Sequence, residues 1–80
     1  MKFHWLEQNL PTGKSYHLVG TVNGVESPAC YITTNGPNYH IHILGMAHRT
    51  VDRSTRIEDV YAFAVAELKM YLLAQISYLP

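Results

Sequence analysis

The histidines are the residues whose spacing could support metal chemistry. His40 and His42 lie two residues apart in the alternating segment 39–44, so on a β-strand they project from the same face. His17 lies in an earlier β-prone segment. Two histidines on one strand and a third from its neighbour can form a three-histidine zinc site. The same spacing also fits polar residues on the wet face of a half-buried strand.

The sequence contains no HExxH or CxxC motif and no carboxylate at a ligand spacing from these histidines. We therefore predict neither a metal site nor a cofactor. His40, His42 and His17 are kept as secondary candidates for metal ligands.

A second cluster precedes the expected C-terminal helix. His48, Arg49, Arg53 and Arg56 fall within nine residues that lead to its N-terminus. Free backbone N–H groups at a helix N-terminus favour anions, and arginine adds bidentate geometry. These four residues are predicted to contact an anion or a partner, such as a nucleic acid, a nucleotide phosphate or an acidic protein patch. In the alternative interpretation, nearby carboxylates neutralise the arginines internally.

Catalysis has little support in the sequence. Cys30 could pair with His17 or His40 as a thiolate and imidazole, but no spacing requires this. No serine elbow or phosphate-binding glycine loop is present. We predict that the chain is not an enzyme, and that Cys30 is a small buried side chain in a reducing compartment.

One long helix, about 55–79, is the dominant predicted element. Thr55 and Glu58 have the spacing of a capping box, and strong helix formers follow without Gly or Pro until Pro80. One broad arc of apolar residues should cover the core. It comprises Ile57, Val60, Tyr61, Ala64, Val65, Leu68, Tyr71 and Leu72.

The opposite side of this helix is also apolar, which is unusual for a helix with one wet face. We predict a partner or dimer interface there, formed by Phe63, Ala66, Met70 and Leu73. The alternative is that a wet surface tolerates these residues. A membrane span is rejected, because Glu67 and Lys69 lie in mid-helix and the uncharged run 70–80 is too short.

The first half of the chain is predicted to form strands at about 2–8, 15–22, 25–34 and 39–45, with 47–53 either a strand extension or a loop. Asn23-Gly24 indicates a type I′ hairpin, and Pro28 indicates an edge or a bulge. The fold class is therefore α+β, an antiparallel meander of three to four strands followed by one helix on one sheet face (β-β-β-α). If Tyr31 shares the open face with His17, His40 and His42, that face is a recognition surface.

Eighty residues predict a single domain, 1–80, and a net charge of zero argues against non-specific nucleic-acid binding. The N-terminus lacks the apolar segment of a secretory signal, so a cytoplasmic location is expected. We predict a non-enzymatic protein-interaction module that forms a homodimer, contacts no membrane, and acts as an inhibitor or adaptor of a protein partner. Small phage-encoded proteins that block host defence are one class of this kind. The alternative function is binding of nucleic acid or nucleotide phosphates through Arg49, Arg53 and Arg56.

Overall fold

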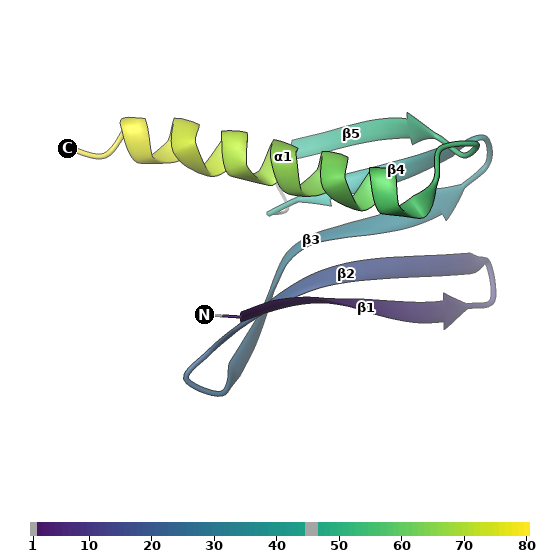
Figure 1. The fold of residues 1–80 in the computed structure, drawn as a ribbon, viewed down its shortest axis with the longest axis horizontal. Helices are drawn as coiled ribbons and strands as arrows, with labels where there is room; N and C mark the ends of the chain where they lie inside the picture. Colours follow the sequence, from purple (N-terminus) through teal and green to yellow (C-terminus); the bar gives the residue numbers. More distant parts are fainter. Residues whose placement is uncertain (1, 45–46) are drawn as a thin grey trace.

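The computed structural model describes residues 2–44 and 47–80, which form five strands followed by one helix (Figure 1). The strands make one antiparallel sheet in the order β1-β2-β3-β4-β5, so each strand pairs with its neighbours in the chain. The predicted α+β meander is confirmed, with five strands in place of three or four. The elements are β1 (Lys2–Leu10), β2 (Gly13–Val22), β3 (Val25–Asn35), β4 (Asn38–Ile43), β5 (Ala47–Asp52) and α1 (Ile57–Ser77).

The fifth strand lies in the segment 47–53, for which the sequence predicted either a strand extension or a loop. β5 pairs with β4 along its whole length, from Ala47 opposite Ile43 to Asp52 opposite Asn38. β1 also runs two residues further than predicted, to Leu10. β4 ends at Ile43, and Gly45, the last residue of the predicted strand, lies outside the described residues.

Two tight turns fix the pairing of the central strands. Asn23 and Gly24 have φ angles of 52° and 79°, the positive values that the predicted type I′ turn requires at both positions. Gly36 has a φ of 65° and is followed by Pro37, whose ring holds φ negative. Glycine in the first central position of a two-residue turn is typical of type II′.

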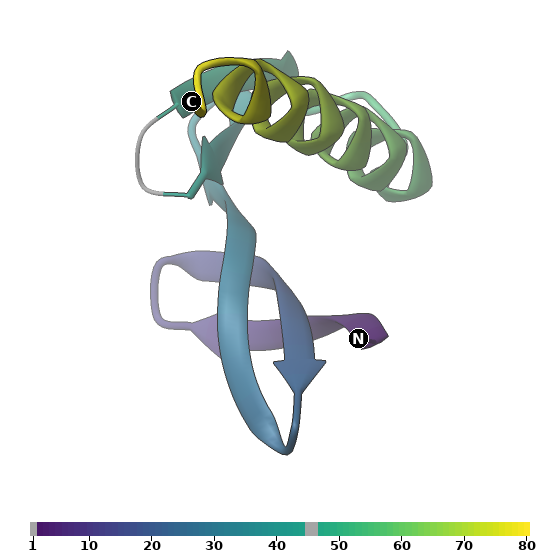
Figure 2. The ribbon, with the colours of Figure 1, turned by 90° about the vertical axis from the view of Figure 1, so that its left-hand side faces the viewer.

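β3 carries an irregularity beside Pro28, as the sequence predicted. Leu18 of β2 lies opposite Cys30, but the next residue, Val19, lies opposite Pro28, so Ala29 is an extra residue on β3. The Ala29 carbonyl instead accepts a hydrogen bond of 3.0 Å from the Leu44 N–H. Figure 2 shows β3 bending between the β1–β2 hairpin and the region of β4, β5 and the helix.

The core lies between the sheet and one face of α1 (Figures 1 and 2). Ile32 of β3 lies directly opposite Ile41 of β4, and both are fully buried. Three buried residues of α1, one on each successive turn, cover this pair: Val60, Ala64 and Leu68. The buried cluster comprises Leu18, Cys30, Ile32, Ile41, Ile43, Val60, Ala64 and Leu68.

Aromatic and charged contacts hold the helix on the sheet at two further places. Tyr61 stacks on Trp5 of β1 with ring centroids 4.2 Å apart, and Tyr16 of β2 meets it edge-on at 5.7 Å. Burial in this cluster raises the pKa of Tyr61 above its usual value. On the other side of the helix, the Glu67 carboxylate lies 3.5 Å from Nε of Arg49 on β5.

The predicted capping box is wrong. The helix N-cap is Arg56, which makes no side-chain capping hydrogen bond, and Glu58 lies 3.7 Å from Nε of Arg56. The reason is the turn that precedes the helix. Asp52 Oδ1 accepts hydrogen bonds from the Ser54 N–H at 2.8 Å and its hydroxyl at 2.6 Å. The Thr55 N–H donates to the Asp52 carbonyl, so Thr55 belongs to that turn.

Shortening a side chain in the Ile32–Ile41 pair should destabilise the domain. We expect Ile41→Val to lower the free energy of unfolding by about 0.5–1.5 kcal/mol, because it leaves a small void under the helix. Urea unfolding followed by Trp5 fluorescence measures this. Val25→Ala changes a side chain that is 68% exposed, and it should stay within about 0.5 kcal/mol of the wild type. Equal losses in the two variants would contradict the assigned core.

Candidate functional site

A row of rings crosses the sheet face opposite the helix. The register places His17 of β2 opposite Tyr31 of β3, Tyr31 opposite His42 of β4, and His42 opposite His48 of β5. Their ring centroids follow at 5.8, 4.4 and 4.8 Å. We call these four residues the ring row. Leu6 of β1 lies opposite His17, so the same register line crosses all five strands.

His40 extends the ring row along β4. Its Nδ1 lies 3.2 Å from Nε2 of His48, and the two rings are nearly parallel with centroids 5.3 Å apart. Its other nitrogen, Nε2, lies 3.4 Å from the carbonyl oxygen of Asn35. Both nitrogens of His40 therefore have defined neighbours, which fixes the orientation of this ring on the sheet.

His17 is held at the other end of the row. Its Nε2 lies 3.0 Å from the hydroxyl of Ser15, which precedes it by two residues on β2. Ser15 is the buried polar residue among the described residues, with 2% of its surface exposed. The hydroxyl and imidazole satisfy each other, as buried polar groups require.

Burial and neighbouring histidines set the electrostatics of this face. Partial burial is the largest cause that lowers the pKa of His42 below its ordinary 6.5, and the nearby His48 and His40 lower it further. A protonated His42 would lose hydration and lie beside two other rings that can carry positive charge. The row is therefore most compatible with a neutral His42.

The structure brings together the four residues predicted to form a sheet-face surface, His17, Tyr31, His40 and His42. Sequence reasoning missed that His48 belongs to this face and not to the arginine cluster. The signal was available, because a fifth strand at 47–52 places His48 directly opposite His42. Within residues 2–44 and 47–80, no group of three or more His, Cys, Asp or Glu side chains is arranged to hold a metal ion.

The three arginines of the predicted anion site make separate contacts. Arg49 projects from the helix-side face of β5 to Glu67, and it also donates to the His48 carbonyl at 2.9 Å. Glu67 lies ten residues into the helix, about 15 Å along its axis from the start. Arg56 lies at that start, beside Glu58. Arg49 and Arg56 thus point to different regions.

Arg53 contacts the hairpin between β3 and β4. Its guanidinium carbon lies 5.4 Å from the centre of the Tyr39 ring, and Nη1 lies 3.4 Å from the Gly36 carbonyl. None of these contacts orients two arginines towards one anion. The anion site stays a prediction without a shared binding geometry.

Cys30 lies on the helix side of the sheet, in the buried cluster. His17 and His40 project from the opposite side, because each is next in sequence to a core residue, Leu18 or Ile41. Burial raises the pKa of the Cys30 thiol to about 11, so the thiol is protonated at neutral pH. The thiolate–imidazole pair considered from the sequence is not formed.

The predicted interface residues of the helix, Phe63, Ala66, Met70 and Leu73, are all exposed. Exposure increases towards the C-terminal half of α1, where Met70 and Leu73 are 65% and 67% exposed. Leu68 is the last buried residue of the helix, and the partly buried Tyr71 also packs against the core. Leu72, predicted to face the core, is instead exposed beside a groove.

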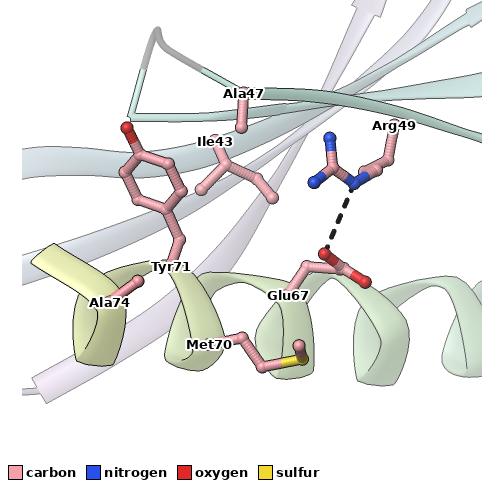
Figure 3. Close-up of a pocket in the computed structure, with 7 residues that line it drawn as sticks. All are labelled: Ile43, Ala47, Arg49, Glu67, Met70, Tyr71 and Ala74. Carbon is pink, nitrogen blue, oxygen red and sulfur yellow. Dashed lines mark ion pairs between the residues drawn. The ribbon is translucent and has the colours of Figure 1, made fainter.

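Shallow hollows flank this half of the helix on both sides. Towards β5 lies a hollow of about 210 Å³ lined by residues such as Ala47, Glu67 and Tyr71 (Figure 3). Towards β1 lies a more apolar groove of about 350 Å³ that we call the β1 groove. It is lined by Phe3, Trp5, Leu18, Val65, Leu68, Lys69 and Leu72.

By length and composition alone, α1 would be long and apolar enough to cross a membrane. Two observations weigh against that use. Its first half covers the sheet core through Val60, Ala64 and Leu68, and the helix carries Glu67 bound to Arg49. Inserting it as a span would expose the sheet's buried isoleucines and place charged groups in hydrocarbon.

No protein-family model matches the chain, and comparisons with curated proteins and with solved structures find no significant match. The geometry of the two faces is therefore the basis on which a function is inferred.

The lowered pKa of His42 predicts a loss of stability in mild acid. A folded-state pKa below the unfolded 6.5 means that the unfolded chain binds protons first as pH falls. The stability that neutral His42 contributes is fully present above about pH 6.5 and decreases below it. We expect a lower urea midpoint at pH 5 than at pH 7.5.

The variant His42→Gln should flatten this dependence, and His4→Gln, which removes a histidine outside the ring row, is the matched control. Asp52 does not contribute in this window, because its hydrogen bonds to Ser54 lower its pKa from an ordinary 3.8. An unchanged pH dependence in His42→Gln would show that another group is responsible.

Proposed function

We propose that this chain is a non-enzymatic protein-interaction module that forms a homodimer through the outer face of α1. The observation that carries the proposal is the exposed apolar surface on the C-terminal half of the helix. Met70, Leu73 and Ile76 lie at helical spacing on this surface, and each is more than 60% exposed. We call these three residues the apolar ridge. Residues 70–80 contain no charged side chain that would keep this surface in water.

The apolar ridge supplies part of the area that a stable dimer needs. Fully burying one large apolar side chain removes on the order of 100 Å² from water. A standard interface buries about 800 Å² per partner, and the three side chains of the apolar ridge supply roughly 300 Å² of it. The other exposed large apolar residues in this region are Phe63, Leu72, Tyr78 and Leu79.

The surface is also suited to meet a copy of itself. A two-fold interface uses the same patch on both chains, so the patch must offer both a projection and a recess. The apolar ridge is the projection, and the β1 groove beside it is the recess. Lys69 is the single charged residue that lines this groove among the described residues. A second copy would therefore bury few charges.

The ring row supplies a second surface on the opposite side of the sheet. Tyr31 and the histidines present polar edges on apolar rings, a composition that suits recognition of a macromolecule. A dimer formed through the helices would leave this face free on each subunit. We therefore assign the role of an inhibitor or adaptor, with the ring row contacting the protein partner.

A charge on the apolar ridge should separate the dimer. We expect the wild type to have a dimer mass at micromolar concentration and Met70→Glu to have a monomer mass. Burying a glutamate at the centre of the interface should weaken association at least about 30-fold, equivalent to about 2 kcal/mol. Light scattering after size-exclusion chromatography measures both masses.

Val25→Glu is the matched control, because Val25 is as exposed as Met70 but lies at the tip of the β2–β3 hairpin. It should remain a dimer. A wild-type monomer at all concentrations would overturn the proposal. Binding of the wild type to lipid vesicles that Met70→Glu abolishes, without any dimer, would overturn it in favour of a membrane surface.

A further inference from the structure

His48 of the ring row and the adjacent His40 hold two imidazole nitrogens at the separation of two ligands on one metal ion. His40 Nδ1 and His48 Nε2 are 3.2 Å apart. Zinc lies about 2.0–2.1 Å from an imidazole nitrogen, so two such nitrogens are roughly 2.9 Å apart at a right angle and about 3.4 Å apart at the tetrahedral angle. The observed separation lies between these limits.

The backbone already selects the nitrogen of His40 that a metal requires. A carbonyl oxygen can only accept a hydrogen bond, so the contact with Asn35 places the proton of neutral His40 on Nε2. Nδ1 then carries the lone pair and faces His48. A ligand histidine whose second nitrogen donates to a backbone carbonyl is the usual outer-shell arrangement at metal sites.

Neighbouring strands position the two rings without help from a loop. His40 lies opposite Thr50 on β5, and His48 lies opposite His42 on β4, so the two residues are diagonal neighbours on the same face. The χ2 torsion of histidine is soft, so the His48 ring can turn its Nε2 lone pair towards an ion on Nδ1 of His40 while the Asn35 contact holds the His40 ring. The backbone of the sheet need not move.

We propose that His40 and His48 form a two-histidine site for a divalent transition-metal ion such as Cu²⁺, Ni²⁺ or Zn²⁺. Imidazole pairs favour these ions over Mg²⁺ and Ca²⁺, which prefer oxygen ligands. Water completes the coordination, since no third side chain among the described residues shares the arrangement. In the metal-free protein, the His48 Nε2–H donates to His40 Nδ1. On binding, that proton moves to Nδ1 of His48 through solvent, so two neutral imidazoles ligate with no net proton release.

Titration calorimetry with Cu²⁺, Ni²⁺ and Zn²⁺ tests the site, with Mg²⁺ as the negative control. We expect one ion per chain, and affinity that falls in acid, because a protonated imidazole cannot ligate. His40→Gln and His48→Gln should each weaken binding by about tenfold or more. His17→Gln and His42→Gln keep the two ligands, and they should change affinity less than about threefold.

Electron paramagnetic resonance of the Cu²⁺ form gives a second readout, in which hyperfine splitting should indicate two equatorial imidazole nitrogens. Circular dichroism checks that each variant is folded. The proposal fails if the wild type binds no better than the double variant His40→Gln/His48→Gln. It also fails if His17→Gln or His42→Gln weakens binding as much as the ligand variants, because the ion would then bind elsewhere on the row. These results do not depend on whether the helix dimerises.

Discussion

The antiparallel register between β3 and β4 decides what lies on both faces of the sheet. Ile32 opposite Ile41 places the branched core residues under the helix, and Tyr31 opposite His42 places the rings on the other side. Because side chains alternate with a period of two, a shift by one residue would exchange the two sets. The isoleucines would then face water and the histidines would face α1. The turn at Gly36-Pro37 sets this register from one end.

The two halves of the helix have different roles, and this explains its unusual sequence. The first half buries one residue per turn on the sheet and stacks Tyr61 on Trp5. The second half continues past Leu68 with an apolar surface that the sheet does not cover. Intrinsic helix propensity and continuous hydrogen bonding carry the helix through this region. The result is a rigid apolar projection on a small domain, and exposed apolar patches of this kind are typical of interaction surfaces.

Much of the fold could be predicted from local signals. Strict alternation over 39–44 identified a strand with its core face, Asn23-Gly24 identified a hairpin, and Pro28 marked an irregularity in β3. The fifth strand was not assigned, since its segment mixes arginine, threonine and histidine without clear alternation. The capping box failed because Asp52 and Ser54 formed a competing turn, and sequence spacing does not decide between two local hydrogen-bonding solutions.

The candidate surfaces also differ in how far the sequence could predict them, because the helix face follows from a local pattern and the sheet face depends on pairing between distant residues. Outer helix residues could be placed from periodicity alone, and all four are exposed. The sheet face could be proposed only on condition that the strands align, since pairing between distant residues sets that alignment. In the arginine cluster, residues that are close in sequence do not point to one place in the structure. Arg49 and Arg56 are seven residues apart, but one faces the middle of the helix and the other its start.

The position of the helix after every strand has a consequence for how the protein is made. Each hairpin can close as soon as its second strand leaves the ribosome, because all pairings join sequence neighbours. The apolar face of the sheet stays open until Val60, Ala64 and Leu68 emerge. During that interval the side chains of Ile32, Ile41 and Ile43 are exposed to water and can associate with other apolar surfaces. The rate at which the last third of the chain is translated would therefore influence how much of the protein reaches its native state.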